Sequence, residues 1–298
     1  RRDSRRIMKH MMKANVGLLL SQQQAKKGFH HVFCTRDVVD ESSLSTTTRE
    51  RGFVFPLYLH PDENAATLFD DTATSPWQPD PDHGNRVPNL SQAFVDDIEE
   101  KLGLPFDAHK VAAGQGAAFG PRDVLAYAYA IFHSPTYRER YAEFLKIDFP
   151  RVPLTSDVDL FWRLVDLGAE LIQLHLMEHP KLHDTYTSFP VTGSNRVKRR
   201  GGFPKFVGKG ESRTKTSDVG ERNRVYINLE QYFAGVPEEV WEFEVGGYQV
   251  LHKWLKDRKG RVLSYDELRH YQQIVVALQE TMRVMERIDD VIPGWPVE

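Results

Sequence analysis

The chain has 298 residues, 40% of them hydrophobic and 27% charged, which fits an ordinary globular protein of one large domain or two of usual size. Its single cysteine, Cys34, excludes an internal disulfide and a cysteine-based zinc site, and it favours a reducing, cytoplasmic location. No apolar run approaches the ~20 residues of a membrane-spanning helix, so we expect no membrane partner.

The net charge of −3 hides a segregated distribution. Residues 193–226 contain ten Lys or Arg and three acidic residues, which gives this segment a charge of +7. Residues 1–13 contain six Lys or Arg and one Asp, which gives +5, so the rest of the chain carries −15. A basic surface on an acidic body indicates a polyanionic partner, which the mean charge alone would not.

The N-terminal part of the chain predicts strands. Segments 15–22, 30–35 and 52–60 are short and β-prone, and polar or glycine-containing breaks separate them. This pattern is typical of a small sheet.

A loop and a helix are predicted next. Residues 61–88 are rich in Asp, Pro and Thr, and they predict a long acidic surface loop. Asn89 is placed to cap a helix over 90–102, and Gly103 is placed to end it.

Residues 119–177 predict three helices in succession. Pro121 suits the first helical turn, where no backbone N–H is needed, and Ser134-Pro135 restarts a helix in the same way. The third helix has three neighbouring N-cap candidates: Thr155, Ser156 and Asp157. Its apolar residues recur at helical spacing: Val158, Phe161, Val165, Gly168 and Ile172.

The C-terminal part predicts short strands and then two helices. Residues 184–235 mix strand candidates with glycine and basic residues. Gly246-Gly247 precedes a predicted helix over about 247–258, and we interpret the glycines as allowing close helix entry rather than phosphate binding. Ser264 and Glu267 form a capping box that opens a long amphipathic helix to about Asp289.

Together these elements predict an α+β fold, with β-rich parts around a central helical scaffold and a C-terminal helical pair. We divide the chain into a β-rich part (1–115), a helical scaffold (116–182), and a basic β-containing insert followed by the C-terminal helices (183–298). Apolar stripes on the two C-terminal helices indicate either core or a face docked on another domain: Tyr248, Leu251, Trp254, Leu255, Leu268, Tyr271, Ile274, Val275, Leu278, Met282 and Met285.

Catalytic signatures are missing from the sequence. The run from Gly202 to Gly208-Lys209 has one residue too many for a phosphate-binding loop and lacks its hydroxyl residue. There is no methyltransferase tetrapeptide, no glycine-rich cofactor fingerprint and no nucleophile elbow. This chain by itself therefore reads as non-catalytic.

Three histidines have the spacing of metal ligands, but we predict no metal site. His175, His179 and His183 are four residues apart, so two of them fit one helix face. Pro180 interrupts the helix between the second and the third, and no cysteine completes a set of four ligands. We interpret them as helix-end and interface histidines.

The amino-acid sequence of several segments resembles the C-terminal target-recognition region of single-chain Type ISP restriction-modification enzymes. The resemblance rests on residues 119–177 and on four other segments in matching order: HMMKANVGLLLSQQQ (10–24), VFPLYL (54–59), INLEQYF (227–233) and VWEFEVGGYQVLHKWLKDRKGRVLSYDELRHYQQIVVALQETMRVMERID (240–289). Because the chain begins with Arg1 rather than methionine, we expect a fragment or a processed product.

The resemblance implies a sequence-specific module that recognises double-stranded DNA. Those large enzymes join a nuclease, an ATP-dependent translocase and an adenine methyltransferase to a DNA-reading module, and a target adenine is flipped into the methyltransferase. The implied partners are duplex DNA and the methyltransferase and motor domains of the same polypeptide. S-adenosylmethionine, ATP and Mg²⁺ would belong to those absent domains, with no cofactor in this chain.

The basic insert supplies the main candidates for DNA contact. By itself it fits either phosphate contact or a solvated loop, and the resemblance favours DNA. Its cations are Arg196, Lys198, Arg199, Arg200, Lys205, Lys209, Arg213, Lys215, Arg222 and Arg224. A smaller basic group follows in the sequence, and some of its members are further candidates for phosphate contact: Lys253, Lys256, Arg258, Lys259 and Arg261.

The N-terminal strand region supplies amides and one arginine near strand ends, where such groups can read base edges or serve ordinary turns. The candidates are Asn15, Gln22, Gln23, Gln24 and Arg36. Two rival functions stay open: a protein-interaction scaffold that docks a partner on the long C-terminal helix, and a stand-alone nuclease.

Overall fold

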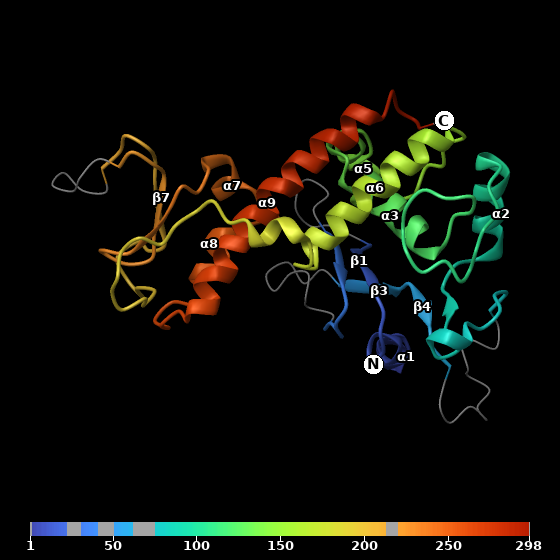
Figure 1. Ribbon diagram of the computed structural model, residues 1–298, viewed down its shortest axis with the longest axis horizontal. Helices are drawn as coiled ribbons and strands as arrows, with labels where there is room; N and C mark the ends of the chain where they lie inside the picture. The colour runs from blue at the N-terminus through green and yellow to red at the C-terminus, as the bar shows by residue number, and fades with distance from the viewer. Residues whose placement is uncertain (1, 23–30, 41–50, 62–74, 213–219, 298) are drawn as a thin grey trace. The chain divides into compact units, whose positions relative to one another are not determined.

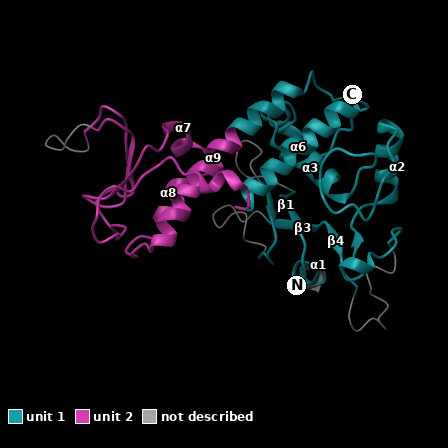
Figure 2. Ribbon diagram, in the orientation of Figure 1, with its two compact units in different colours: residues 1–176, 283–298 teal, residues 177–282 magenta. Residues whose placement is uncertain are grey.

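The computed structural model describes residues 2–22, 31–40, 51–61, 75–212 and 220–297. The chain forms two compact units (Figure 2): unit 1 comprises residues 1–176 and 283–298, and unit 2 comprises residues 177–282. The predicted β-rich part and most of the predicted helical scaffold therefore share unit 1. In the described residues, no helix is long and apolar enough to cross a membrane.

Unit 1 begins with a helix and a small antiparallel sheet in the order β2-β1-β3 (Figure 1). The elements are α1 (Arg2–Met11), β1 (Gly17–Ser21), β2 (Val32–Thr35) and β3 (Gly52–Pro56). Met11 of α1 packs on Leu19 and Val54, which lie on one face of the sheet. The three predicted strand segments are thus confirmed.

The predicted acidic loop is partly wrong, because its described end is folded. The strand β4 (Tyr58–Leu59) pairs with β5 (Val87–Pro88), and a 3₁₀ turn, η1 (Pro81–His83), lies between them. Val87 is fully buried. The composition of the segment favoured a loop, but pairing with a distant strand orders this end of it. Residues 62–74 lie outside the described residues.

The helix α2 (Gln92–Leu102) was predicted, but its cap was not. Ser91 caps it by accepting a hydrogen bond from the Phe94 backbone N–H, and Gly103 ends it in the left-handed region. Asn89 lies outside the helix, where its amide donates to the Pro56 carbonyl at 2.9 Å. Asn89 therefore serves the sheet region instead of the helix.

The predicted helical block is confirmed, and it contains one short helix beyond the three predicted. It comprises α3 (Pro121–His133), α4 (Pro135–Arg140), α5 (Ala142–Leu145) and α6 (Val158–His175). Pro121 and Pro135 occupy first turns, Ser134 caps α4, and Asp157 caps α6 by accepting from the Leu160 N–H at 3.0 Å. Leu125 of α3 packs beside Tyr58, which joins this block to the strands of unit 1.

Unit 2 starts with a 3₁₀ turn, η2 (Pro180–His183), and a second three-stranded antiparallel sheet. Its strands are β6 (Lys205–Val207), β7 (Arg224–Tyr226) and β8 (Tyr232–Ala234), in the order β6-β7-β8. Small elements follow: α7 (Glu238–Glu242), β9 (Glu244–Val245), β10 (Tyr248–Gln249) and α8 (Val250–Lys256). Mixed helices and small sheets confirm the predicted α+β class.

The predicted start of the helix at Gly247 is wrong. Gly246 and Gly247 both have positive φ and form the turn of the β9-β10 hairpin, so α8 begins only at Val250. Residues of both predicted apolar stripes, among them Leu251 and Tyr271, are buried in the core of unit 2, together with Val225 and Phe233 of its sheet. Apart from Tyr248, the stripe residues up to Met282 thus serve the core of this unit.

The predicted capping box is confirmed at the start of α9 (Tyr265–Val291). The Glu267 backbone N–H donates to Ser264 Oγ at 3.1 Å, and the Ser264 N–H donates to Glu267 Oε2 at 3.0 Å. The helix is counted in unit 2 up to Met282 and in unit 1 from Arg283.

Replacing Ser264 with alanine should lower the free energy of unfolding of unit 2 by about 1 kcal/mol, because the Glu267 N–H loses its acceptor. Denaturant unfolding followed by hydrogen exchange of α9 amides measures this loss. Ser156→Ala is a matched control, because Asp157 caps the helix beside it. A loss no larger than that of the control would contradict the role of this cap.

Candidate nucleic-acid interface

The basic loop of unit 2 is held by a backbone pairing between two segments far apart in the sequence. The Val197 N–H donates to the Arg261 carbonyl at 2.9 Å, and the Gly260 N–H donates to the Val197 carbonyl at 2.7 Å. One step further, the Leu263 N–H donates to the Asn195 carbonyl at 2.9 Å. The pairing joins the basic insert to the basic turn that follows α8.

Six cations around this pairing form what we call the basic ridge: Arg196, Arg199, Arg200, Lys256, Lys259 and Arg261. All are exposed except Lys259, which is half-buried. Arg196 Nη1 donates to the Gly260 carbonyl at 2.6 Å, and a Cβ at Gly260 would lie 2.1 Å from Arg199 Nε. Arg199 therefore packs against the glycine, whose φ of +85° also disfavours a side chain.

Most of the ridge lacks a neutralising carboxylate. Glu267 pairs with Arg261 at 2.8 Å and with the neighbouring Arg258 at 3.3 Å. The Ser264 backbone N–H, with these two guanidinium groups, holds the pKa of Glu267 below its usual value. Within the described part of the chain, the ridge cations other than Arg261 form no ion pair with a carboxylate.

The pKa of His252, which lies beside the ridge, reflects the positive charge of the ridge. Partial burial lowers the pKa of His252, and the charges of Lys256 and Lys259 lower it further. A surface that disfavours a proton in this way favours an anion.

The sheet of unit 2 places one more predicted cation, Arg224, against an aromatic ring. Paired residues of antiparallel strands share a face, so Arg224, Tyr226 and Tyr232 lie on the face opposite the core residues Val225 and Phe233. The Arg224 guanidinium lies 4.9 Å from the centre of the Tyr232 ring and donates to the Tyr226 hydroxyl at 3.1 Å.

Lys198 is held in a comparable way, with its Nζ 5.5 Å from the centre of the Phe203 ring. Lys205, Lys209 and Arg222 are exposed. Arg213 and Lys215 lie outside the described residues, so they stay predictions. The structure thus joins the segment of Arg196, Arg199 and Arg200 to the turn after α8, which carries Lys259 and Arg261 of the smaller predicted basic group.

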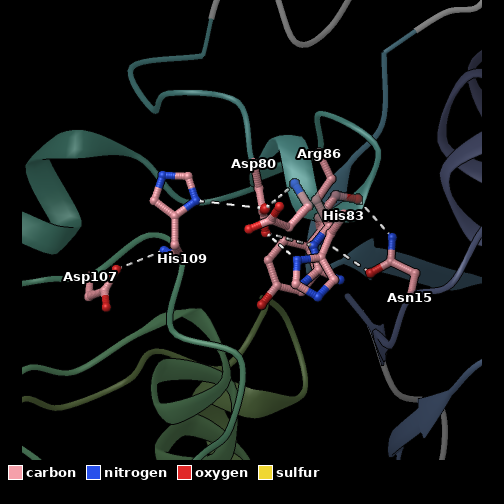
Figure 3. Close-up of polar contacts among 8 residues, drawn as sticks. Asn15, Asp80, His83, Arg86, Asp107 and His109 are labelled. Atoms are coloured by element: carbon pink, nitrogen blue, oxygen red, sulfur yellow. Dashed lines mark hydrogen bonds and ion pairs between the residues drawn. The ribbon is translucent and has the colours of Figure 1, made fainter.

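Asn15 is buried and bonded within the fold, which argues against its candidacy as a base-reading residue. It is 6% exposed, and Figure 3 shows polar contacts from its amide to a neighbouring segment. Its amide nitrogen donates to the carbonyls of His10 and Tyr58, and its amide oxygen accepts from the N–H groups of Val16 and Tyr58. An amide with these four bonds is a structural link, with no group left to read a base.

The other N-terminal candidates lie in unit 1. Gln22 and Arg36 are exposed, and Arg36 Nη1 lies 3.5 Å from the Asn15 carbonyl oxygen. Gln23 and Gln24 fall outside the described residues.

A polar cluster around Asp80 has no signal in the sequence (Figure 3). Asp80 accepts from His83 Nδ1 at 2.8 Å and lies 3.8 Å from Arg86 Nε and 4.0 Å from His109 Nδ1. The Arg86 guanidinium lies 3.9 Å from the centre of the Tyr58 ring. Because Asp80 and Arg86 are buried, we assign the cluster to holding the turn before β5 in place.

The three spaced histidines occupy helix ends. His175 lies in the last turn of α6, where its Nδ1 is 2.6 Å from the Tyr129 hydroxyl. His179 caps η2 by accepting from the Lys181 N–H. The described residues contain no group of three His, Cys, Asp or Glu side chains able to hold a metal ion.

An α+β chain with a basic ridge, in which five of the six cations form no ion pair with a described carboxylate, fits a class of polyanion-binding recognition modules. Within that class, the chain belongs to the family of Type ISP C-terminal specificity domains, whose family model matches residues 1–287.

Solved structures share the fold at low sequence identity. The ATP-dependent Type ISP restriction-modification enzyme LlaBIII bound to DNA matches with a TM-score of 0.60 and 16% identity over 97% of this chain. A nuclease-deletion mutant of the Type ISP enzyme LlaGI, in complex with a DNA substrate mimic, matches with a TM-score of 0.57 and 17% identity over 95%. A DrdV–DNA complex matches with a TM-score of 0.60 and 19% identity over 92%.

This chain spans 17%, 22% and 25% of the lengths of those three proteins, respectively. No curated protein matches it.

Proposed function

We propose that this chain is the double-stranded DNA recognition module of a restriction-modification enzyme, and that the basic ridge contacts the DNA backbone. The observation that carries this proposal is that two distant segments of unit 2, joined by backbone pairing, supply five cations that form no ion pair with a carboxylate of the described residues. The membership of the family and the DNA complexes of three similar structures support it.

The ridge fits the phosphate part of recognition. Lys and Arg that replace condensed counterions make affinity fall steeply with salt, by ~0.9 in log affinity per log unit of salt for each phosphate neutralised. Such contacts position the duplex without reading its sequence. Base reading would then fall to other side chains, and among the predicted ones the exposed Gln22, Arg36, Lys205, Lys209 and Arg222 stay candidates.

The chemistry of such an enzyme would lie outside these residues. We propose that the methyltransferase, translocase and nuclease domains are the partners of this module, in the cytoplasm. S-adenosylmethionine, ATP and Mg²⁺ would bind to those domains, since this sequence has no motif for any of them.

Replacing Arg199 and Arg200 together with alanine should weaken binding to every duplex about tenfold at low salt and lower the salt slope by about two. Fluorescence anisotropy of a labelled mixed-sequence duplex, titrated at several salt concentrations, measures both quantities. Loss of two phosphate contacts predicts both changes, whereas a general loss of folding would not leave a defined slope.

The matched control is Lys101→Ala with Arg140→Ala, which removes two exposed cations from helices of unit 1. It changes the net charge by the same amount and should leave affinity within about twofold of the wild type. If the two double variants bind alike, the DNA surface lies elsewhere. A wild-type chain whose binding does not respond to salt would instead favour the protein-interaction scaffold.

A further inference from the structure

A buried glutamine lies directly behind the basic ridge. Gln231, which precedes β8, is 1% exposed. Its Oε1 accepts from the Asn195 backbone N–H at 2.7 Å, and its Nε2 donates to Asn195 Oδ1 at 2.8 Å and to the Val191 carbonyl at 3.0 Å. One side chain thus fixes both ends of the segment 191–195.

Asn228 extends this arrangement to the first ridge residue. Its amide nitrogen donates to Gln231 Oε1 at 3.0 Å and to the Arg196 carbonyl at 3.1 Å. Its amide oxygen accepts from the backbone N–H groups of Glu230 and Gln231. We call Gln231 and Asn228 the amide clamp.

The clamp works together with the backbone pairing. Asn195 has a φ of +52°, an uncommon conformation outside glycine, and the clamp holds both its N–H and its side chain there. After Arg196, the Val197 N–H is bound by Arg261 and the Lys198 N–H by Ile227. Four consecutive residues are therefore fixed immediately before Arg199 and Arg200.

We propose that Gln231 is a positioning residue for DNA binding, which holds the 195–198 segment so that Arg199 and Arg200 meet the phosphates without further ordering. This inference rests on the proposed function. Ordering a loop at an interface costs free energy at the moment of binding, and a loop that is ordered beforehand avoids that cost. A buried neutral amide thereby acts on affinity through cations that it does not touch.

Gln231→Leu should weaken binding of the full chain to a labelled mixed-sequence duplex about fivefold, with a smaller salt slope, although no charge is lost. The decisive measurement is a double-mutant cycle with Arg199→Ala. Since a displaced arginine contributes less, the loss caused by Arg199→Ala should be about threefold smaller in Gln231→Leu than in the wild type.

Two further variants secure the test. Gln272→Leu is the matched control: it also removes a glutamine bond to a carbonyl of unit 2, that of Thr187, away from the clamp. It should leave affinity unchanged and the effect of Arg199→Ala intact. If Gln231→Leu fails to fold, Gly193→Ala replaces it, because its Cβ would lie 2.8 Å from Gln231 Cδ and push the clamp aside.

The outcomes separate this inference from the proposed function. A wild-type chain that binds no duplex overturns both. Binding by the wild type, with equal losses for Arg199→Ala in the wild-type and clamp-variant backgrounds, overturns the positioning role alone. A reduced loss in the clamp variants, with unchanged behaviour of Gln272→Leu, supports it.

Discussion

Replacing Gly168 with alanine should lower the free energy of unfolding of unit 1 by at least about 3 kcal/mol, the upper end of the usual cost of overpacking a core. A Cβ at this position would lie 1.8 Å from the carbonyl oxygen of Ala126 and 2.6 Å from its carbonyl carbon. Both atoms belong to the backbone of α3, which cannot give way as a flexible side chain would. The two central helices of unit 1 would have to move apart.

The same substitution at Gly294 provides the control, because no atom lies within 4 Å of a Cβ there and its φ is not in the left-handed region. At Gly168 the steric cost must also exceed the gain of about 1 kcal/mol that alanine brings to a helix interior. Urea unfolding with hydrogen exchange of α3 and α6 amides measures both variants. Equal stability of the two would mean that α3 and α6 do not pack as closely as the structure has them.

Local signals account for what the sequence could predict. Proline in a first turn, a serine or aspartate cap and a capping box each act within four residues, so Pro121 and Ser264 could be placed from the sequence alone, and Asp157 was one of three neighbouring candidates. Gly168 was also predicted to lie on the apolar face of its helix. Its close contact with Ala126, however, depends on a neighbour that periodicity cannot identify.

The errors at Asn15, at Asn89 and in the acidic loop involve distant partners. Asn15 and Asn89 have side chains suited to caps or to base edges. In the fold, however, the Asn15 amide is hydrogen-bonded to the Tyr58 backbone and the Asn89 amide to the Pro56 carbonyl, each more than 30 residues away. The acidic loop was wrong at its end because Val87 pairs with β4. Composition reports what a residue is able to bind, and the fold decides which partner it meets.

In the candidate site, too, some features have a local signal in the sequence and others depend on distant partners. The cations of the ridge could be found by counting charge, since exposed Lys and Arg need no partner to remain on a surface. Their grouping depends on the pairing of Val197 with Gly260 and Arg261, which has no local signal. Gln231 also had none, because a lone glutamine before a short strand looks like any surface residue until its four hydrogen-bond partners are known.

Acidification should destabilise unit 1 between pH 6.5 and about 4, because three of its histidines resist protonation in the fold. Burial lowers the pKa of His60 to about 4, with a further contribution from the charge of Lys13. Burial also lowers the pKa of His175 to about 4 and that of His133 well below 6.5, and the Arg138 guanidinium adds to both shifts. All three rings are therefore neutral in the folded unit while the unfolded chain takes up protons.

The direction follows from which state binds more protons. The unfolded histidine gains its proton near pH 6.5, whereas the folded one gains it only near pH 4. The stability that these rings contribute is therefore complete above pH 6.5 and is lost as the pH falls towards 4. For His60, which is 6% exposed, the shift corresponds to a loss of about 3 kcal/mol across this window.

Hydrogen exchange of α3 and α6 amides in urea, repeated across this pH range, measures the slope. His60→Gln has no proton to gain at this site, so its stability should fall less steeply than that of the wild type, whatever its value at neutral pH. Leu171→Ala, a buried residue of α6, should instead lower stability by a similar amount at every pH. If His60→Gln and the wild type lose stability in parallel, His60 gains its proton at the same pH in the folded and the unfolded chain, and burial does not lower its pKa.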